Sequence, residues 1–370
     1  MNNVPFVDLS HQNAVVRDEI FQAWSQLVDD ADFVLGQNVS KFEKDFAEFC
    51  GLAECVAVGN GGDAVEFALR VLGVASGDEV IIPANTFIAT ATAVERIGAI
   101  PVLVDVDSAT QLIVPEEVEL KINDRTKAVV AVHLFGQMAP MRQLSSICKK
   151  HGVSLIEDAA QAQGALQDGN GLGFYSDVVA TSFYPGKNLG AYGDAGAILT
   201  NDEEIAQRLF EMRNYGGTVK YVHPTMGYNS RLDNMQASVL SAKLVHLNKW
   251  NEQRNEIATA YKERLVDSQD IVLPKVDTSN FHVWHLYVIQ LSNREKMMEH
   301  LTNNGVGFGI HYPTPIHLHG AFSYLGKKVG DFPIAEHLSN AILSLPMYPG
   351  MKVDQINYVS ETIKSCPGLN

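Results

Sequence analysis

The stretch AVVAVHLFGQMAPMRQLSSICKKHGVSLIEDAAQ, residues 128–161, decides the fold. It opens with an apolar run of strand length at Ala128–Val132 and closes with a second run at Ser154–Glu157. Between them, Met141–Lys150 has a helical pattern that Gly152 ends. Two strands joined by a crossover of helical length run parallel to each other. The sequence therefore predicts an α/β protein with a mostly parallel sheet that is covered on both faces.

Short runs rich in β-branched residues recur on either side of this unit. They lie at Cys55–Val58, Val80–Ile82, Val102–Val104, Val178–Ser182 and Ala197–Thr200. After the first of them, Ala64–Leu72 places apolar side chains on one helical face, and Asp63 stands where an N-cap is expected. Ligands of such sheets bind beyond the carboxyl ends of the strands, so we expect functional residues just after these runs.

The second half of the chain has a different pattern. Asp233–Leu265 is rich in polar residues and contains no proline, so we predict one long helix there. Beyond Pro274 we expect a short strand region, a helix and a loop rich in proline and histidine, at His282–Leu291, Arg294–Asn304 and Gly309–Gly320 respectively. This change predicts a large α/β domain over residues 1–245 and a smaller C-terminal α+β domain over residues 246–370.

Composition and charge argue against several classes of protein. Of the 370 residues, 46% are hydrophobic and 19% are charged, and the formal net charge of −15 opposes nucleic-acid binding. The four cysteines have no CxxC spacing, which is typical of thiols in a reducing compartment. The first residues lack the pattern of a secretory leader, and apolar runs such as Ala128–Val132 are far shorter than the ~20 residues needed to cross a bilayer. We expect a cytoplasmic protein without a membrane partner.

Three segments at predicted strand ends carry residues suited to catalysis. A buried carboxylate at Asp158 would cap a helix, form a salt bridge, or pair with the protonated pyridine nitrogen that makes pyridoxal phosphate an electron sink. Lys187 follows Ser182 by five residues on a Pro-Gly loop. A partly buried lysine at this position could form a Schiff base and move protons, whereas the alternative interpretation is an exposed loop lysine without a catalytic role. The turn at residues 59–63 could bind an anion through its glycine N–H groups, or it could be only a tight turn between a strand and a helix.

Two other nucleotide-binding motifs match incompletely. Gly59, Gly61 and Ala64 fit a relaxed dinucleotide fingerprint, so a nicotinamide oxidoreductase is a second hypothesis, although no acid ends the next predicted strand. A phosphate-binding P-loop around Lys187 lacks its first glycine, and Asn188 stands where serine or threonine would bind magnesium.

Polar residues in the second half of the chain suggest further hypotheses about binding sites. Three histidines of the C-terminal loop resemble a metal cluster: His311, His317 and His319. No acidic or cysteine ligand accompanies them, so we predict substrate contact or packing and no metal. The polar turn Gly227–Asp233 caps a helix, or lets Asn229 and Arg231 reach an anion across a subunit boundary.

In their order and spacing, these motifs resemble the DegT/StrS-type nucleotide-sugar aminotransferases, which have the aspartate-aminotransferase-like fold of fold type I pyridoxal-phosphate enzymes. The segments that match are GNGGDAV (59–65), PANTFIATATA (83–93), EDAAQAQGA (157–165), TSFYPGKNLGAYGDAGAILTN (181–201), GYNSRLDNMQA (227–237) and, more loosely, HVWHLYVIQ (282–290) and GIHYPTPIHLHGAF (309–322). The resemblance spans essentially the whole chain. It implies a transaminase that alternates between pyridoxal 5'-phosphate and pyridoxamine 5'-phosphate and moves an amino group from glutamate to a nucleotide-linked keto-sugar.

The resemblance also implies roles for matching residues. Lys187 carries the cofactor as a Schiff base, Asp158 pairs with the pyridine nitrogen, and Gln161 lies against the hydroxyl side of the ring. The residues implied to stack on the ring or to hold the phosphate are Phe87, Ser182, Gly61, Gly62, Asp63 and, from the neighbouring subunit of a homodimer with shared sites, Asn229. The residues implied to contact the substrate are Tyr184, Arg231, His311 and Tyr312.

The sequence departs from the family pattern in two places. Gly62 stands where many relatives have threonine, so a hydroxyl contact to the phosphate is missing, and Phe87 lacks the polar group of the tryptophan or tyrosine found in some relatives. A histidine at position 187 would mark the dehydratase branch, so Lys187 favours transamination.

The substrate is predicted less narrowly than the reaction. The overall pattern resembles the branch that aminates C3 of a sugar, such as a dTDP-linked 3-keto-6-deoxyhexose for lipopolysaccharide or O-antigen, while amination at C4 and a UDP-linked sugar stay open. A regulator that keeps the fold and cofactor without turnover is the non-enzymatic hypothesis. The complete set of Lys187, Asp158, Gln161 and Ser182 argues against it.

Overall fold

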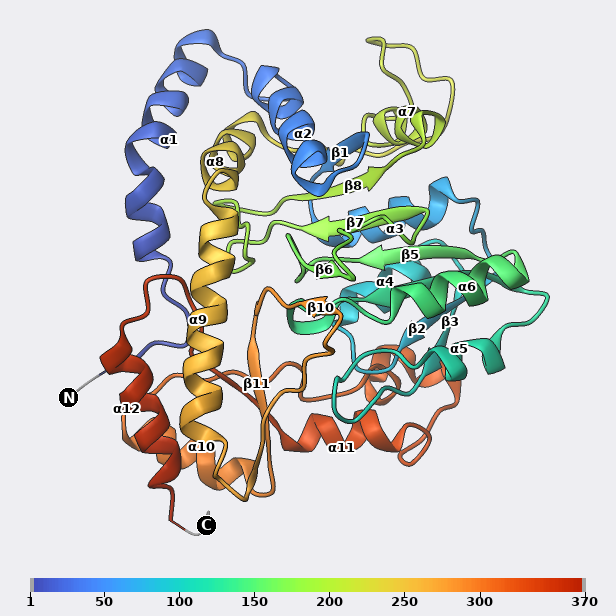
Figure 1. Ribbon diagram of the computed structural model, residues 1–370. Helices are drawn as coiled ribbons and strands as arrows, with labels where there is room; N and C mark the ends of the chain where they lie inside the picture. The colour runs from blue at the N-terminus through green and yellow to red at the C-terminus, as the bar shows by residue number, and fades with distance from the viewer. Residues whose placement is uncertain (1–2, 368–370) are drawn as a thin grey trace.

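A seven-stranded sheet forms the centre of the computed structural model, which describes residues 3–367 (Figure 1). Its strands stand in the order β1-β8-β7-β5-β4-β2-β3, and only β8 is antiparallel to its neighbours. The predicted α/β class with a mostly parallel sheet is therefore confirmed. The strands are β1 (Glu54–Val58), β2 (Glu79–Pro83), β3 (Ile100–Val104), β4 (Thr126–Val132), β5 (Ser154–Asp158), β7 (Val178–Ser182) and β8 (Gly196–Thr200).

Both faces of this sheet are buried under helices. In β1, Val56 and Val58 belong to one cluster of buried side chains together with Phe67 of α3, whereas Ala57 belongs to a second cluster with Phe46 of α2. Figure 1 shows α3 and α6 on opposite sides of the sheet. Burial on both faces explains the nearly continuous apolar runs of the strands. The helices of this part are α1 (Ser10–Asp30), α2 (Gln37–Cys50), α3 (Gly61–Val71), α4 (Ile88–Arg96), α5 (Pro115–Lys121), α6 (Met141–His151) and α7 (Glu203–Met212).

The long helix predicted over Asp233–Leu265 is two helices, so that prediction is wrong in its middle. α8 (Asn234–Leu244) ends before Val245, and α9 (Leu247–Leu265) begins after His246. The N–H of His246 bonds the carbonyl of Lys243, three residues back, at 3.0 Å, which tightens the last turn and interrupts the α-helical pattern. No proline or glycine at the junction signals this break in the sequence.

A second, smaller sheet lies in the C-terminal part of the chain. β11 (Tyr287–Leu291) pairs antiparallel with β12 (Ile342–Leu345) and β9 (Ile271–Val272). Its helices are α10 (Arg294–Asn303), α11 (Pro333–Ala341) and α12 (Val353–Lys364), and a short pair of strands, β6 (Leu166–Gln167) and β10 (Asn280–Phe281), lies apart from both sheets. The strand predicted over His282–Leu291 begins only at Tyr287, because Trp284 has a positive φ of 48° that breaks the extended backbone.

The beginning of the described chain packs against its C-terminal part. Val4 forms a β-bridge with Val306 and lies in the cluster of buried side chains that fills the C-terminal part. The division into residues 1–245 and 246–370 stays a prediction. Within residues 3–367, none of the helices is both apolar enough and long enough to span a bilayer.

Candidate active site

A cavity of about 590 Å³ opens at the carboxyl ends of the parallel strands, where ligands of such sheets bind. Phe87 follows β2, Asp158 ends β5, and Lys187 follows β7; all three line the cavity. The opposite wall comes from α9 and from the C-terminal part, through Arg254, His285, Leu286, His311, Tyr312 and Met347. The sheet therefore brings together residues that are a hundred positions apart in the sequence.

Lys187 lies on a tight turn directly after β7. Its N–H donates to the carbonyl of Tyr184 at 2.8 Å, which closes the turn through Pro185 and Gly186 and directs the loop over the strand ends. Burial lowers the pKa of the Lys187 amine to about 8, against the opposing effect of the Asp158 carboxylate. A sizeable fraction of the amine is therefore unprotonated near neutral pH, as a nucleophilic lysine requires.

Asp158 presents a buried carboxylate to the cavity. Its Oδ2 accepts a hydrogen bond from Oγ1 of Thr90 at 2.8 Å, and its Oδ1 accepts one from the N–H of Ala160 at 3.2 Å. Oγ1 of Thr90 lies 2.9 Å from Oγ1 of Thr86, so α4 and the loop before it fix the orientation of the carboxylate. Neither donor carries a charge, which leaves the carboxylate able to stabilise a cation in the cavity.

The N-terminus of α3 forms an anion cradle beside the end of β7. Gly61 approaches Ser182 so closely that a Cβ on Gly61 would lie 2.5 Å from Cβ of Ser182. The N-cap is Asn60, whose Oδ1 accepts the N–H of Asp63 at 2.8 Å. The first intrahelical bond is donated by Ala64, so the N–H groups of Gly61 and Gly62 precede it and point away from the helix.

Asp63 does not have the position expected from the sequence. It is the third residue of α3 and not its N-cap, because Asn60 takes that role. Its carboxylate accepts hydrogen bonds from Arg96 at 2.9 Å and from the hydroxyl of Ser230 at 2.7 Å, and Asp63 does not line the cavity. Asp63 therefore stabilises the N-terminus of α3 through Arg96 and Ser230 and does not itself line the cavity.

Gln161, Phe87 and Tyr312 meet at one side of the cavity. Nε2 of Gln161 donates to the hydroxyl of Tyr312 at 3.1 Å, and Oε1 of Gln161 accepts from the N–H of Phe135 at 2.6 Å. The rings of Phe87 and Tyr312 have centroids 5.2 Å apart. Phe87 is half exposed at 50%, so its ring borders an opening that a flat ligand can enter.

The remaining predicted contacts divide into two groups. Tyr184 and His311 line the cavity, and burial lowers the pKa of His311 to about 4, so its imidazole is neutral at physiological pH. Asn229 and Arg231 do not line the cavity of their own chain. Asn229 forms a β-bridge with Asn214, and Nη1 of Arg231 donates to Oδ1 of Asn214 at 3.1 Å.

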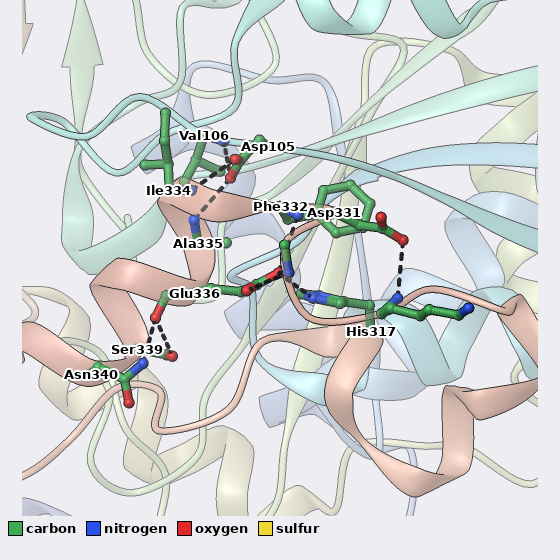
Figure 2. A network of polar contacts seen from close by, with 12 residues as sticks. Asp105, Val106, His317, Asp331, Phe332, Ile334, Ala335, Glu336, Ser339 and Asn340 are labelled. Atoms are coloured by element: carbon green, nitrogen blue, oxygen red, sulfur yellow. Dashed lines mark hydrogen bonds and ion pairs between the residues drawn. The ribbon is translucent and has the colours of Figure 1, made fainter.

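The three histidines of the C-terminal loop do not converge on one point. Nε2 of His317 lies 2.9 Å from Oε1 of Glu336, which also accepts the N–H groups of Gly330 and Phe332 (Figure 2). An acidic partner therefore exists, contrary to the expectation from the sequence, but it pairs with His317 as a structural contact. Within residues 3–367, no group of three or more His, Cys, Asp and Glu side chains is arranged to hold a metal.

The polar residues that line the cavity and were missed by sequence reasoning include Thr86, Thr90, Asp194, Arg254 and His285. The two threonines lie in the PANTFIATATA segment and follow a predicted strand, so a signal was present. Arg254 and His285 reach the cavity from α9 and from the loop before β11. His285 lies in the loosely matching HVWHLYVIQ segment, whereas no local pattern marks Arg254.

These groups fit one cofactor. A close-packed anion cradle, a buried carboxylate and an amine of lowered pKa share a single cavity, and they match the phosphate, ring nitrogen and aldehyde of pyridoxal phosphate. Fold and site together define a pyridoxal-phosphate enzyme. The sequence model of the DegT/DnrJ/EryC1/StrS aminotransferase family matches residues 15–364, and the chain belongs to this family.

Similar proteins cover almost the whole chain. The erythromycin biosynthesis sensory transduction protein EryC1 of Saccharopolyspora erythraea is 44% identical, over 98% of this chain and 99% of that protein. The dTDP-3-amino-3,4,6-trideoxy-alpha-D-glucose transaminase of Streptomyces venezuelae is 41% identical, over 98% and 95% respectively. The relatives include transaminases of both dTDP-linked and UDP-linked amino sugars.

A solved structure confirms the fold class. The structure of S. venezuelae DesV in complex with a ketimine intermediate superposes with a TM-score of 0.97 at 40% identity, covering 98% of each chain. The aspartate-aminotransferase-like fold and the transaminase activity predicted from the sequence are therefore confirmed. Family membership also decides against the nicotinamide oxidoreductase.

Proposed function

We propose that this chain transfers an amino group from glutamate to C3 of a dTDP-linked 3-keto-6-deoxyhexose. The observation that carries the proposal is the convergence of Lys187, Asp158 and the α3 anion cradle in one cavity, in a chain that belongs to a sugar aminotransferase family. Support for C3 comes from relatives named for 3-amino sugars, at 41% and 42% identity.

The residues of the chain divide the chemical work. Bound pyridoxal phosphate supplies an aldehyde that takes up amines and a ring that withdraws electrons from the adjacent carbon. We propose that Nζ of Lys187 first holds the cofactor and then moves the proton at the reacting carbon in each half of the transfer. Asp158 keeps the ring nitrogen protonated, and the N–H groups of Gly61 and Gly62 with Ser182 bind the phosphate.

Further contacts follow from the walls of the cavity. We propose that Phe87 stacks on the cofactor ring and that Gln161, held by Tyr312, lies beside the ring hydroxyl. The exposed side chain of Tyr184, 60% accessible, borders the opening where the sugar nucleotide enters, and His311 contacts the sugar as a neutral imidazole. Tyr184 and His311 would therefore orient the substrate without exchanging a proton with it.

The assembly proposed for the reaction is a homodimer in the cytoplasm. Asn229 and Arg231 do not line the cavity of their own chain, and this placement suits residues that reach the phosphate and substrate of a neighbouring subunit. The aminated sugar would then enter a surface polysaccharide such as lipopolysaccharide or O-antigen. A UDP-linked sugar is the second candidate, because a UDP-sugar 3-aminotransferase is also 41% identical. Amination at C4 is the third.

A substrate panel tests the proposal. The purified holoenzyme is incubated with glutamate and each of four sugars, the 3-keto and 4-keto forms linked to dTDP or UDP, and products are identified by mass spectrometry and NMR. We expect amination of the dTDP-linked 3-keto sugar and none with Lys187→Ala. Amination at C4 alone, or only of UDP-linked sugars, would replace the proposed substrate, and no amination of any sugar would refute the proposed function.

A further inference from the structure

The cavity contains few positive charges for an enzyme that binds anions. Among its described lining residues, the cations are Lys187 and Arg254, and the carboxylates are Asp158 and Asp194. Burial lowers the pKa of His285 well below its usual range, so that imidazole adds no charge. Because the Lys187 amine is committed to the cofactor, Arg254 is the described lining residue that keeps a positive charge in the cavity throughout the reaction.

Arg254 lacks the carboxylate partner that a buried cation usually has. It is 4% exposed, and the ion pairs within residues 3–367 do not include it. Its Nη1 lies 3.0 Å, 3.1 Å and 3.3 Å from the carbonyl oxygens of Trp284, Met347 and His285. Burial lowers its pKa only to about 10, so the guanidinium keeps its charge at neutral pH.

One edge of this guanidinium is free. The three carbonyls occupy Nη1 and hold the group rigidly, whereas Nε is buried without a hydrogen-bond partner, and the described residues offer none to Nη2. Nε–H and Nη2–H form a parallel pair of donors that matches the two oxygens of a carboxylate. A buried donor without a partner is costly, so this edge is suited to a ligand.

We propose that the free edge of Arg254 binds a carboxylate of the amino donor while Lys187 moves the proton at the adjacent carbon. This inference rests on the proposed transamination. A carboxylate is favoured over the diphosphate of the sugar nucleotide because Arg254 lies deep in the cavity, while the exposed Phe87 and Tyr184 border the opening. A small planar anion such as a carboxylate can reach such a site. Once the donor product has left, the site is free again when the sugar binds in the second half of the reaction.

Separate half-reactions test the assignment. The donor half is followed as loss of the holoenzyme absorbance band at about 410–430 nm when an amino donor is added without any sugar. For Arg254→Gln, we expect the glutamate concentration that gives the half-maximal rate to rise at least about thirtyfold, the loss typical of a removed partner in a buried charge pair. Arg254→Lys keeps the positive charge but loses the pair of parallel N–H donors. Its half-maximal glutamate concentration is expected to lie between the values of Arg254→Gln and the wild type.

Two controls separate binding from structure. Benzylamine is an amine without a carboxylate, so its reaction with the holoenzyme should change less than about threefold in Arg254→Gln. Arg294 is the matched variant, because its Nη1 also bonds two backbone carbonyls and its Nε is also buried and unpartnered, but it does not line the cavity. Arg294→Gln is expected to lower thermal stability without changing the dependence on glutamate. If Arg254→Gln does not fold, the comparison is made with Arg254→Lys.

The outcomes are distinct. Equal losses with glutamate and benzylamine would show that Arg254 only supports the fold, and a loss confined to the sugar half would assign it to the diphosphate; either result overturns the proposal. Equal losses with glutamate, glutamine and alanine would place the α-carboxylate at Arg254, and a loss only with glutamate would place the side-chain carboxylate there; both support it. The donor half requires no sugar, so failure of the substrate panel would leave this result standing.

Discussion

Lys187 and Lys243 are both buried amines whose pKa is lowered to about 8 by burial, but only Lys187 lines the cavity. Condensation with an aldehyde needs the neutral amine, which is the minor form below pH 8 and the major form above it. We expect cofactor-free protein to bind pyridoxal phosphate at a rate that rises about tenfold per pH unit below 8 and then levels off. Stopped-flow absorbance between pH 6 and 9.5 measures this rate.

The paired control separates position from basicity. Lys187→Ala should show no band, while Lys243→Met should keep the band, because Nζ of Lys243 instead donates to the carbonyl of Gly190 at 2.7 Å. A rate that keeps rising about tenfold per pH unit up to pH 9.5, without levelling off, would contradict the lowered pKa of Lys187.

A second residue-scale prediction concerns Asp158. Replacing its carboxylate with an amide in Asp158→Asn removes the charge that we propose faces the ring nitrogen and keeps the size, so we expect the single-turnover rate with glutamate to fall by about 10²–10³. Thr90→Val keeps the carboxylate and removes one hydrogen bond to it, so a smaller loss of about tenfold is expected. A larger loss in Thr90→Val than in Asp158→Asn would count against the role of the charge.

The sequence predicted some residues of the site and missed others for a physical reason. Asp158 and Ser182 end apolar strands and Lys187 follows one, and the sheet places such positions at one edge whatever the details of packing. Arg254 and His285 come from parts of the chain whose position depends on how α9 and the C-terminal part dock, and no local periodicity contains that information.

Among the elements, the N-terminus of α3 gives a sharp prediction. Gly61→Ala places a Cβ 2.5 Å from Cβ of Ser182, whereas a Cβ at Gly62 meets only Oδ1 of Asn60, at 3.2 Å. We expect Gly61→Ala to weaken binding of pyridoxal phosphate at least about tenfold, because overpacking of this size costs about 1–3 kcal/mol. Gly62→Ala is the matched control and should change the dissociation constant much less, as titration of cofactor-free protein would show. Equal effects would argue against close packing at Ser182.

The beginning of α11 is held by charged groups from elsewhere. Asp105 accepts the N–H groups of Ile334 and Ala335, both at 2.9 Å, and Glu336 joins His317 to the backbone of Gly330 (Figure 2). Hydrogen bonds from the N–H groups of Gly330 and Phe332 and from His317 outweigh desolvation and lower the pKa of Glu336. A carboxyl with a depressed pKa stabilises the fold above its unfolded pKa and loses that contribution as the pH falls through the folded value.

Glu336→Gln should therefore lower the melting temperature most above the usual glutamate pKa of about 4.5, and the difference from the wild type should narrow at lower pH. Scanning calorimetry across this range measures it. A constant difference at every pH would refute the charge-based explanation. Element boundaries such as the break after Leu244 could not be predicted, because neither proline nor glycine marks the point where the bond from His246 to Lys243 ends α8.

For the whole molecule, the alternation of strands and helices sufficed to predict the parallel sheet and the edge that carries the site. The reversal of β8 was not predicted, since periodicity contains no strand direction. The packing of Val4 against the C-terminal part was also beyond local patterns, because it joins segments that lie some three hundred positions apart. These long-range contacts decide which residues close the cavity opposite Lys187.

The proposed shared site gives the last prediction. Lys187 lines the cavity of its own chain and Asn229 does not, so each active site of a homodimer would take Lys187 from one subunit and Asn229 from the other. Lys187→Ala and Asn229→Asp, which sets a negative charge against the phosphate, should each be almost inactive alone. Mixing and re-associating the two variants makes hybrid dimers with one site in which both residues are intact. Activity should recover to about a quarter of the wild-type value at random pairing. No recovery, with hybrid dimers verified by native mass spectrometry, would show that each chain builds its site alone.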